Sequence, residues 1–226
     1  MPARTSPLTI ALPSGGSISG LLQVPANAEA CYVFAHGAGA GMNHAFMAAI
    51  AQGLAERAIA TLRFNFPFME QGSKRPDSPA VAHVAVRAAV AEASRQLPRV
   101  PLFAGGKSYG GRMTTQAQAV EALPGVLGIV LVGFPLHPAG KPSTERAAHL
   151  AGVKVPMLFL QGTRDGLADL ELITQTTAGL AKRATLHIVE GADHAFHVLV
   201  RSGRNDEQVR EELQGTMASW MKKQKR

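Results

Sequence analysis

The chain of 226 residues is 46% hydrophobic and 17% charged, which excludes a disordered chain and fits one globular domain, residues 1–226. The net charge of +7 does not indicate a nucleic-acid partner, because four of the positive charges lie in the last five residues and aromatic residues are only 5%. The single cysteine, Cys31, excludes an intramolecular disulfide framework. No apolar run reaches the roughly 18 residues of a membrane span, and residues 1–10 lack the apolar core of a secretory signal. We therefore expect a cytoplasmic protein with no membrane partner.

Strand and helix patterns alternate along most of the chain. Residues 1–25 are expected to form an antiparallel hairpin at a sheet edge, with a turn at Ser14-Gly15-Gly16. The elements expected after it are a strand at 31–35, a helix at 44–57, a strand at 60–64, a helix at 79–97, a strand at 101–104, a helix at 109–121, strands at 126–132 and 155–160, a helix at 170–180, a strand at 184–189 and a helix at 206–221. This order predicts a doubly wound α/β fold, whose mostly parallel sheet is flanked by helices on both faces.

A glycine-bounded serine follows the expected strand at 101–104. The segment from Gly106 to Gly110 has the pattern Gly-x-Ser-x-Gly, and a helix is expected directly after it. In such a strand–turn–helix elbow, a strained turn lifts the serine above the sheet, and glycines tolerate the close approach of neighbouring backbone. Ser108 is therefore the candidate nucleophile.

A serine hydroxyl needs a base that takes its proton, and the base needs an acid that orients it. His194 follows the expected strand at 184–189, and Asp165 follows the strand before that. Because the carboxyl ends of parallel strands meet at one rim, both side chains are expected beside Ser108. Asp193 is a poor alternative acid, since neighbouring residues in a turn project apart, and Asp169 is expected to cap a helix.

Two backbone amides are expected to bind the developing oxyanion. One belongs to Tyr109, directly after the candidate nucleophile, and the other to the glycine-rich loop at 36–41. Within that loop Ala38 is the first candidate and Gly39 the second. No metal or cofactor is expected, because the His-x-x-His pattern of His194 and His197 lacks the carboxylates of a metal site.

Several motifs together resemble the α/β-hydrolase superfamily, in its small, lidless dienelactone-hydrolase-like branch. They are His36-Gly37, Arg63-Phe64-Asn65-Phe66, Gly106-x-Ser108-x-Gly110-Gly111-Arg112, Gly162-x-x-Asp165 and Asp193-His194. Arg63 through Asp77 further resembles a little-characterised bacterial group related to a eukaryotic chromatin-complex subunit. Dienelactone hydrolases proper carry cysteine where this chain has Ser108, so the resemblance implies carboxylesterase-like chemistry rather than their lactone substrate.

The same resemblance gives expectations about the substrate site. Family lids follow the strand that corresponds to 126–132, but here residues 134–153 leave room only for a short helix at 144–150, and no cap domain is expected. Arg63 and Met69 are candidate substrate-binding residues. The rim cations, which include Lys107 and Arg164, either attract an anionic substrate or satisfy loop carbonyls.

The resulting hypothesis is a serine hydrolase that cleaves small soluble esters or thioesters, with a small-molecule substrate as its partner and a monomeric or homodimeric state. The alternative is a non-catalytic binding or scaffold module on the same fold. Amide cleavage, acyl transfer and perhydrolysis on the same residues also remain open, because a fold alone does not separate them.

Overall fold

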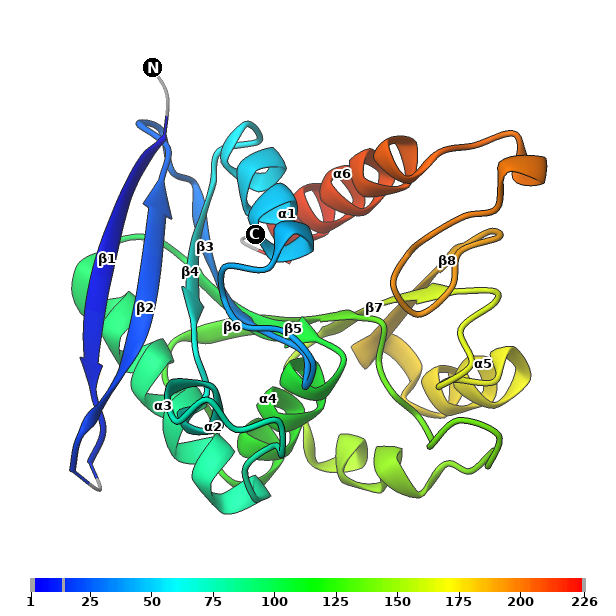
Figure 1. Cartoon of the computed structure of the whole chain (residues 1–226), viewed down its shortest axis with the longest axis horizontal. Coiled ribbons are helices and arrows are strands. Elements are labelled where there is room, and N and C mark those ends of the chain that lie inside the picture. The colour runs from blue at the N-terminus through cyan, green and yellow to red at the C-terminus, as the bar shows by residue number, and fades with distance from the viewer. Residues whose placement is uncertain (1–2, 14, 225–226) are drawn as a thin grey trace.

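The computed structural model describes residues 3–13 and 15–224. Ser14 of the expected turn and two residues of the basic C-terminus, Lys225 and Arg226, lie outside the described residues. One eight-stranded sheet runs through the molecule in the order β1-β2-β4-β3-β5-β6-β7-β8 (Figure 1). The expected N-terminal hairpin is present as β1 (Arg4–Ala11) and β2 (Ser17–Val24), which pair antiparallel at the sheet edge.

The other six strands run parallel to one another. They are β3 (Ala30–Ala35), β4 (Ile59–Phe64), β5 (Leu102–Lys107), β6 (Val126–Val132), β7 (Met157–Gly162) and β8 (Ala184–Val189). Every residue of β3, β4 and β7 is buried, as expected when helices cover both faces of a parallel sheet. The predicted doubly wound α/β fold is confirmed.

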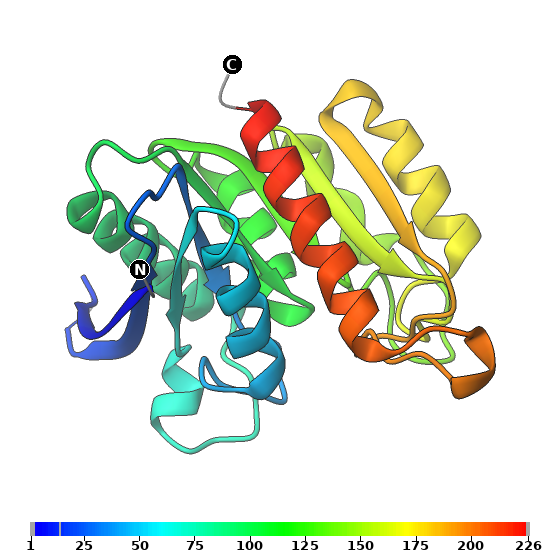
Figure 2. The same ribbon diagram turned by 90° about the horizontal axis from the view of Figure 1, so that it is seen from above.

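Helices form a layer on each face of this sheet (Figures 1 and 2). One layer holds α1 (Ala45–Ala55) and α6 (Asp206–Gln224), which pack against each other. The opposite layer holds α3 (Pro79–Gln96), α4 (Tyr109–Val120) and α5 (Leu170–Gly179), with the short helix α2 (Pro67–Glu70) beside them. Three 3-10 segments complete the described elements: η1 (Glu145–Gly152), η2 (Ala181–Arg183) and η3 (Val200–Ser202).

The apolar core is correspondingly divided by the sheet. Buried side chains of α3 and α4 form one cluster with the strands, and those of α1 and α6 form the other. Leu213, Met217 and Trp220 lie buried in the second cluster, in agreement with their helical spacing in the sequence. None of the helices within 3–13 and 15–224 is long and apolar enough to cross a membrane.

Several elements differ from expectation in their bounds or type. β7 (Met157–Gly162) was expected at 155–160, for example, and three other differences bear on the site. β5 continues to Lys107 instead of ending at 104, because Gly105 and Gly106 remain paired with β6. A Cβ atom on Gly105 would lie 1.9 Å from the carbonyl oxygen of Val130, so the glycines permit a close approach rather than ending the strand. Pro67 begins α2 in a segment that was expected to be a loop. Residues 134–153 contain the 3-10 segment η1 where a short helix was expected.

Candidate active site

Ser108 is the single residue between β5 and α4, and its backbone is strained. Its φ of 51° and ψ of −116° fall in a region that side-chain-bearing residues rarely adopt. Two hydrogen bonds hold this turn: the Ser108 amide donates to Val132 O at 3.1 Å, and the Ser108 carbonyl accepts from the Arg112 amide at 3.1 Å. The expected strand–turn–helix elbow is therefore present, with the serine at the N-terminus of α4.

Two glycines of the elbow lie where no side chain fits. A Cβ atom on Gly106 would lie 2.5 Å from Ala35 O, and one on Gly110 would lie 2.5 Å from His36 O. These obstacles are backbone atoms of β3 and the loop that follows it, so they cannot move aside as a flexible side chain would. The Gly-x-Ser-x-Gly pattern thus reflects the close approach of the elbow to β3.

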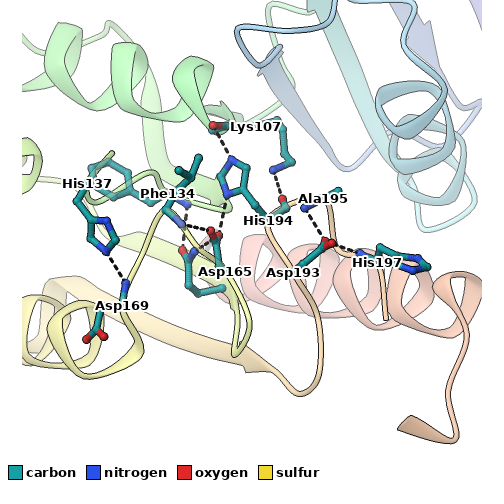
Figure 3. A network of polar contacts seen from close by, with 12 residues as sticks. Lys107, Phe134, His137, Asp165, Asp169, Asp193, His194, Ala195 and His197 are labelled. Carbon is teal, nitrogen blue, oxygen red and sulfur yellow. Dashed lines mark hydrogen bonds and ion pairs between the residues drawn. The ribbon is translucent and has the colours of Figure 1, made fainter. Parts of the chain in front are cut away.

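The structure brings Ser108, His194 and Asp165 into one hydrogen-bonded chain. His194 Nδ1 lies 2.7 Å from Asp165 Oδ2 (Figure 3), and His194 Nε2 lies 2.8 Å from Ser108 Oγ. The three residues follow β5, β7 and β8, whose carboxyl ends meet at the same rim. With the imidazole proton on Nδ1, Nδ1–H donates to the carboxylate and Nε2 accepts from the serine hydroxyl.

The Asp165 carboxylate is completely buried and fully partnered. Oδ2 accepts from Gln161 Nε2 at 2.5 Å in addition to His194, and Oδ1 accepts from the Leu167 amide at 2.8 Å. Gln161 is itself fixed, because its Oε1 accepts from the Phe134 amide at 3.0 Å. Gln161 was not among the site residues predicted from the sequence. Its signal was an amide side chain at the end of an apolar strand, four residues before the candidate acid.

The competing acids and the second histidine have other partners. Asp169 accepts from the Leu172 amide at the start of α5, which is the capping role expected for it. Asp193 accepts from the amides of Ala195 and His197 at 2.8 and 2.9 Å, and His197 pairs with Asp206 at 2.9 Å. Among the described residues, the His194 imidazole bonds the carboxylate of Asp165 rather than that of Asp169 or Asp193.

The loop after β3 lies beside Ser108. Ala38 and Gly39 line the same cavity as the serine, and Tyr109 is the first residue of α4. Within the described part of the chain, the amides of Ala38 and Tyr109 donate no hydrogen bond. His36 fixes the start of this loop: its Nδ1 donates to Gly37 O at 2.7 Å and its Nε2 accepts from the Phe66 amide at 3.0 Å. Burial lowers the pKa of His36, which favours the neutral ring that this pattern requires.

A cavity of about 630 Å³ opens in front of Ser108. Its lining is mostly apolar, with Phe46 and Met47 from α1, Ala40 from the loop after β3, and Leu167 and Ala139 from the other side. Lys107 and Arg164 also line the cavity, but both donate to loop carbonyls: Lys107 Nζ to His194 O, and Arg164 to Gly191 O. A cavity of this size suits a small organic ligand.

The structure does not bring Arg63 and Met69 into this cavity, contrary to expectation. Arg63 is 4% exposed within β4, and its Nη1 donates to Met42 O at 2.9 Å. Burial lowers the pKa of Arg63. Met69 packs against the core from α2, with its Cε close to Gly41. Both residues contact the loop at 36–42 without lining the cavity, so their effect on the cavity is indirect.

Comparisons with known proteins agree with this fold. The family model of an alpha/beta hydrolase domain matches residues 28–222. A dienelactone hydrolase from Anabaena variabilis superposes with a TM-score of 0.77 at 18% identity, covering 97% of each chain. An alpha-beta serine hydrolase homologue from Coxiella burnetii gives a TM-score of 0.75 at 20% identity, covering 93% of this chain and 96% of that one.

A serine hydrolase without a lid from Xanthomonas campestris is a third similar structure, with a TM-score of 0.74 at 20% identity over 97% of this chain and 96% of that one. Identities this low show a shared fold and do not carry over a substrate. The family model covers most of the sequence, including the elbow and the residues hydrogen-bonded to it. The chain therefore belongs to the alpha/beta hydrolase domain family.

Proposed function

We propose that the protein is a serine hydrolase that cleaves carboxylic esters by two-step acyl transfer, with Ser108, His194 and Asp165 as its catalytic residues. The observation that carries this proposal is the unbroken chain from Ser108 Oγ to His194 Nε2 at 2.8 Å and from His194 Nδ1 to Asp165 Oδ2 at 2.7 Å. A strained elbow and an apolar cavity adjoin this chain of contacts. A scaffold protein has no need of such an arrangement.

In the first step His194 Nε2 takes the hydroxyl proton of Ser108 while Oγ attacks the ester carbonyl carbon. The tetrahedral oxyanion is held by the amides of Tyr109 and Ala38, which donate to no other described residue. When the intermediate collapses, the bond to the leaving oxygen breaks and His194 returns the proton to that oxygen. Asp165 stays ionised and stabilises the imidazolium.

In the second step a water molecule occupies the place of the departed alcohol. His194 takes a proton from this water, and the resulting hydroxide attacks the acyl carbon bound to Ser108. Collapse releases the carboxylic acid and returns the proton to Ser108 Oγ. The apolar lining of the cavity supports small organic esters or thioesters as substrates.

The test is labelling with a fluorophosphonate probe together with hydrolysis of p-nitrophenyl butyrate. Wild type is expected to label and to hydrolyse, and Ser108→Ala and His194→Ala are expected to lose both. The matched control is Ser94→Ala, which changes an exposed serine on α3 and is expected to behave as wild type. If folded wild type neither labels nor turns over esters, the hydrolase proposal is wrong and a binding role takes its place.

A further inference from the structure

Lys107, directly before Ser108, points its ammonium at the loop that carries His194. Nζ lies 2.5 Å from the backbone oxygen of His194 (Figure 3) and 5.3 Å from the centre of the Phe196 ring. A Cβ atom on Gly133 would lie 3.0 Å from Lys107 Nζ and 3.5 Å from His194 Nδ1. The ammonium and the imidazole therefore border the same small space, and one hydrogen bond links the end of β5 to the loop after β8.

The loop that carries His194 contains a strained residue. Phe196, two residues after His194, has a φ of 64°, which is an outlier for a bulky side chain. Its ring stacks on Phe46 of α1, with centroids 6.0 Å apart. The Asp193 carboxylate holds the amides of Ala195 and His197. Within the described part of the chain, the His194 carbonyl is bonded by Lys107 and by no other group.

We propose that Lys107 is a positioning residue whose ammonium holds the His194 carbonyl and thereby keeps the imidazole within reach of Ser108. This inference rests on the proposed function. The ammonium is charged and the carbonyl is partly buried, so the bond is of the stronger, charge-assisted kind. A loop shift of about 1 Å at the base is enough to lower turnover by roughly 100-fold.

The same geometry gives the enzyme an alkaline limit. Burial lowers the pKa of Lys107 to about 8, against the opposing attraction of Asp165 and Asp193. These two carboxylates, with the His194 imidazole and the Phe196 ring, are the groups that face the ammonium. Below this pH the ammonium donates a charge-assisted bond. Above it the neutral amine donates a weaker one, so turnover falls as the pH rises through about 8.

The decisive variants are Lys107→Met, which fills the space without a donor, and Lys107→Arg, which keeps a charged donor at all accessible pH values. We expect kcat of Lys107→Met to fall about 10- to 100-fold with a much smaller change in KM, and its alkaline limb to disappear. Lys107→Arg is expected to recover most of kcat and to stay active above pH 9. A Lys107→Met enzyme with wild-type kcat and the wild-type alkaline limb would overturn the proposal.

Two further variants complete this experiment, one as a control and one as a replacement for Lys107→Met. Lys154→Met, which changes an exposed lysine, is the control and should match wild type in kcat and in its pH profile. If Lys107→Met does not fold, Lys107→Gln replaces it, with an uncharged donor of similar bulk and an expected intermediate kcat. A Lys107→Gln enzyme with the kcat of wild type and an unmoved alkaline limb also contradicts the proposal.

Amide hydrogen exchange of residues 191–197 separates this inference from the hydrolase proposal, because it does not depend on activity. We expect faster exchange there in Lys107→Met than in wild type, with α4 and β5 unchanged. If wild type neither labels nor hydrolyses esters, but residues 191–197 still exchange faster in Lys107→Met, the hydrolase proposal fails. The role of Lys107 in holding the loop is then still supported. Equal exchange in wild type and Lys107→Met shows that Lys107 does not hold the loop.

Discussion

The two walls of the crevice around Ser108 are built in opposite ways. One wall, here called the polar wall, is formed by the end of β7 and the loops after β7 and β8. It is held by side-chain hydrogen bonds, in which the Asp165 carboxylate contacts both His194 and Gln161. The other wall, here called the bare wall, is formed by the loop after β3 and by the elbow. It consists mostly of glycines and alanines, and Gly37, Ala38, Gly39 and Ala40 line the cavity there. The polar wall depends on particular polar atoms. The bare wall depends on unbonded backbone amides and on positions where no side chain fits. Different substitutions should therefore impair the two walls.

The largest effect is expected where the polar wall loses its charge. Asp165→Asn keeps the shape of the side chain but favours the wrong imidazole tautomer, so kcat should fall by about 10³- to 10⁴-fold. Steady-state hydrolysis of p-nitrophenyl butyrate measures this change. Asp169→Asn, at the start of α5, is the matched control and should retain turnover. An Asp165→Asn enzyme with nearly full turnover would assign the acid to another residue.

On the opposite wall, loss of one backbone amide should be the most damaging change to chemistry. Ala38→Pro removes the proposed oxyanion donor, and kcat should fall by about 10²- to 10³-fold. Ala38→Gly keeps the amide and is the control, with kcat expected to stay near that of wild type. Comparing the two variants in kcat and in thermal unfolding separates the amide from the methyl group. Equal kcat in both would place the second oxyanion donor elsewhere.

A side chain added to a glycine of the bare wall should lower the stability of the fold rather than act directly on catalysis. In Gly110→Ala the new methyl group would meet His36 O at 2.5 Å, and such overpacking should lower the free energy of unfolding by about 3 kcal/mol. For a chain of this length the melting temperature should drop by roughly 6–12 °C. Gly215→Ala makes the same change in the open middle of α6 and should be neutral or slightly stabilising. Similar melting temperatures for both variants would contradict the close approach at the elbow.

A smaller effect is expected from a change at Gln161, which contacts Asp165 and reaches His194 only through it. Gln161→Leu removes a donor to Asp165 and leaves the Phe134 amide without its acceptor. Unfolding free energy should fall by about 1–3 kcal/mol, and kcat by about tenfold as the carboxylate gains freedom. Chemical denaturation and steady-state kinetics measure the two changes. Gln161→Leu with unchanged kcat would show that the Leu167 amide and His194 orient Asp165 without help.

The contrast between the walls also explains which site residues could be predicted from the sequence and which could not. Topology alone places Ser108, Asp165 and His194 at one rim, because each follows a parallel strand and those strands end together. The direction of a side chain within a strand is not fixed by topology. Arg63 was therefore expected at the substrate, although it is buried in β4 and bonds Met42 O. The inward-facing amide of Gln161 went unnoticed for the same reason. The bond from Lys107 to His194 O depends on a loop conformation that no motif encodes.

The smallest effect should come from Gly39, the glycine of the bare wall with the most space around it. A Cβ atom on Gly39 would meet nothing within 4 Å, and its φ lies outside the left-handed region. Gly39→Ala also keeps the backbone amide, so unfolding free energy should change by no more than about 0.5 kcal/mol and kcat by no more than about threefold. Thermal unfolding and ester hydrolysis of Gly39→Ala are measured and compared with those of Gly110→Ala and Ala38→Pro. A large loss of kcat at unchanged stability would mean that bending of the loop at Gly39, rather than the Ala38 amide alone, forms the oxyanion site.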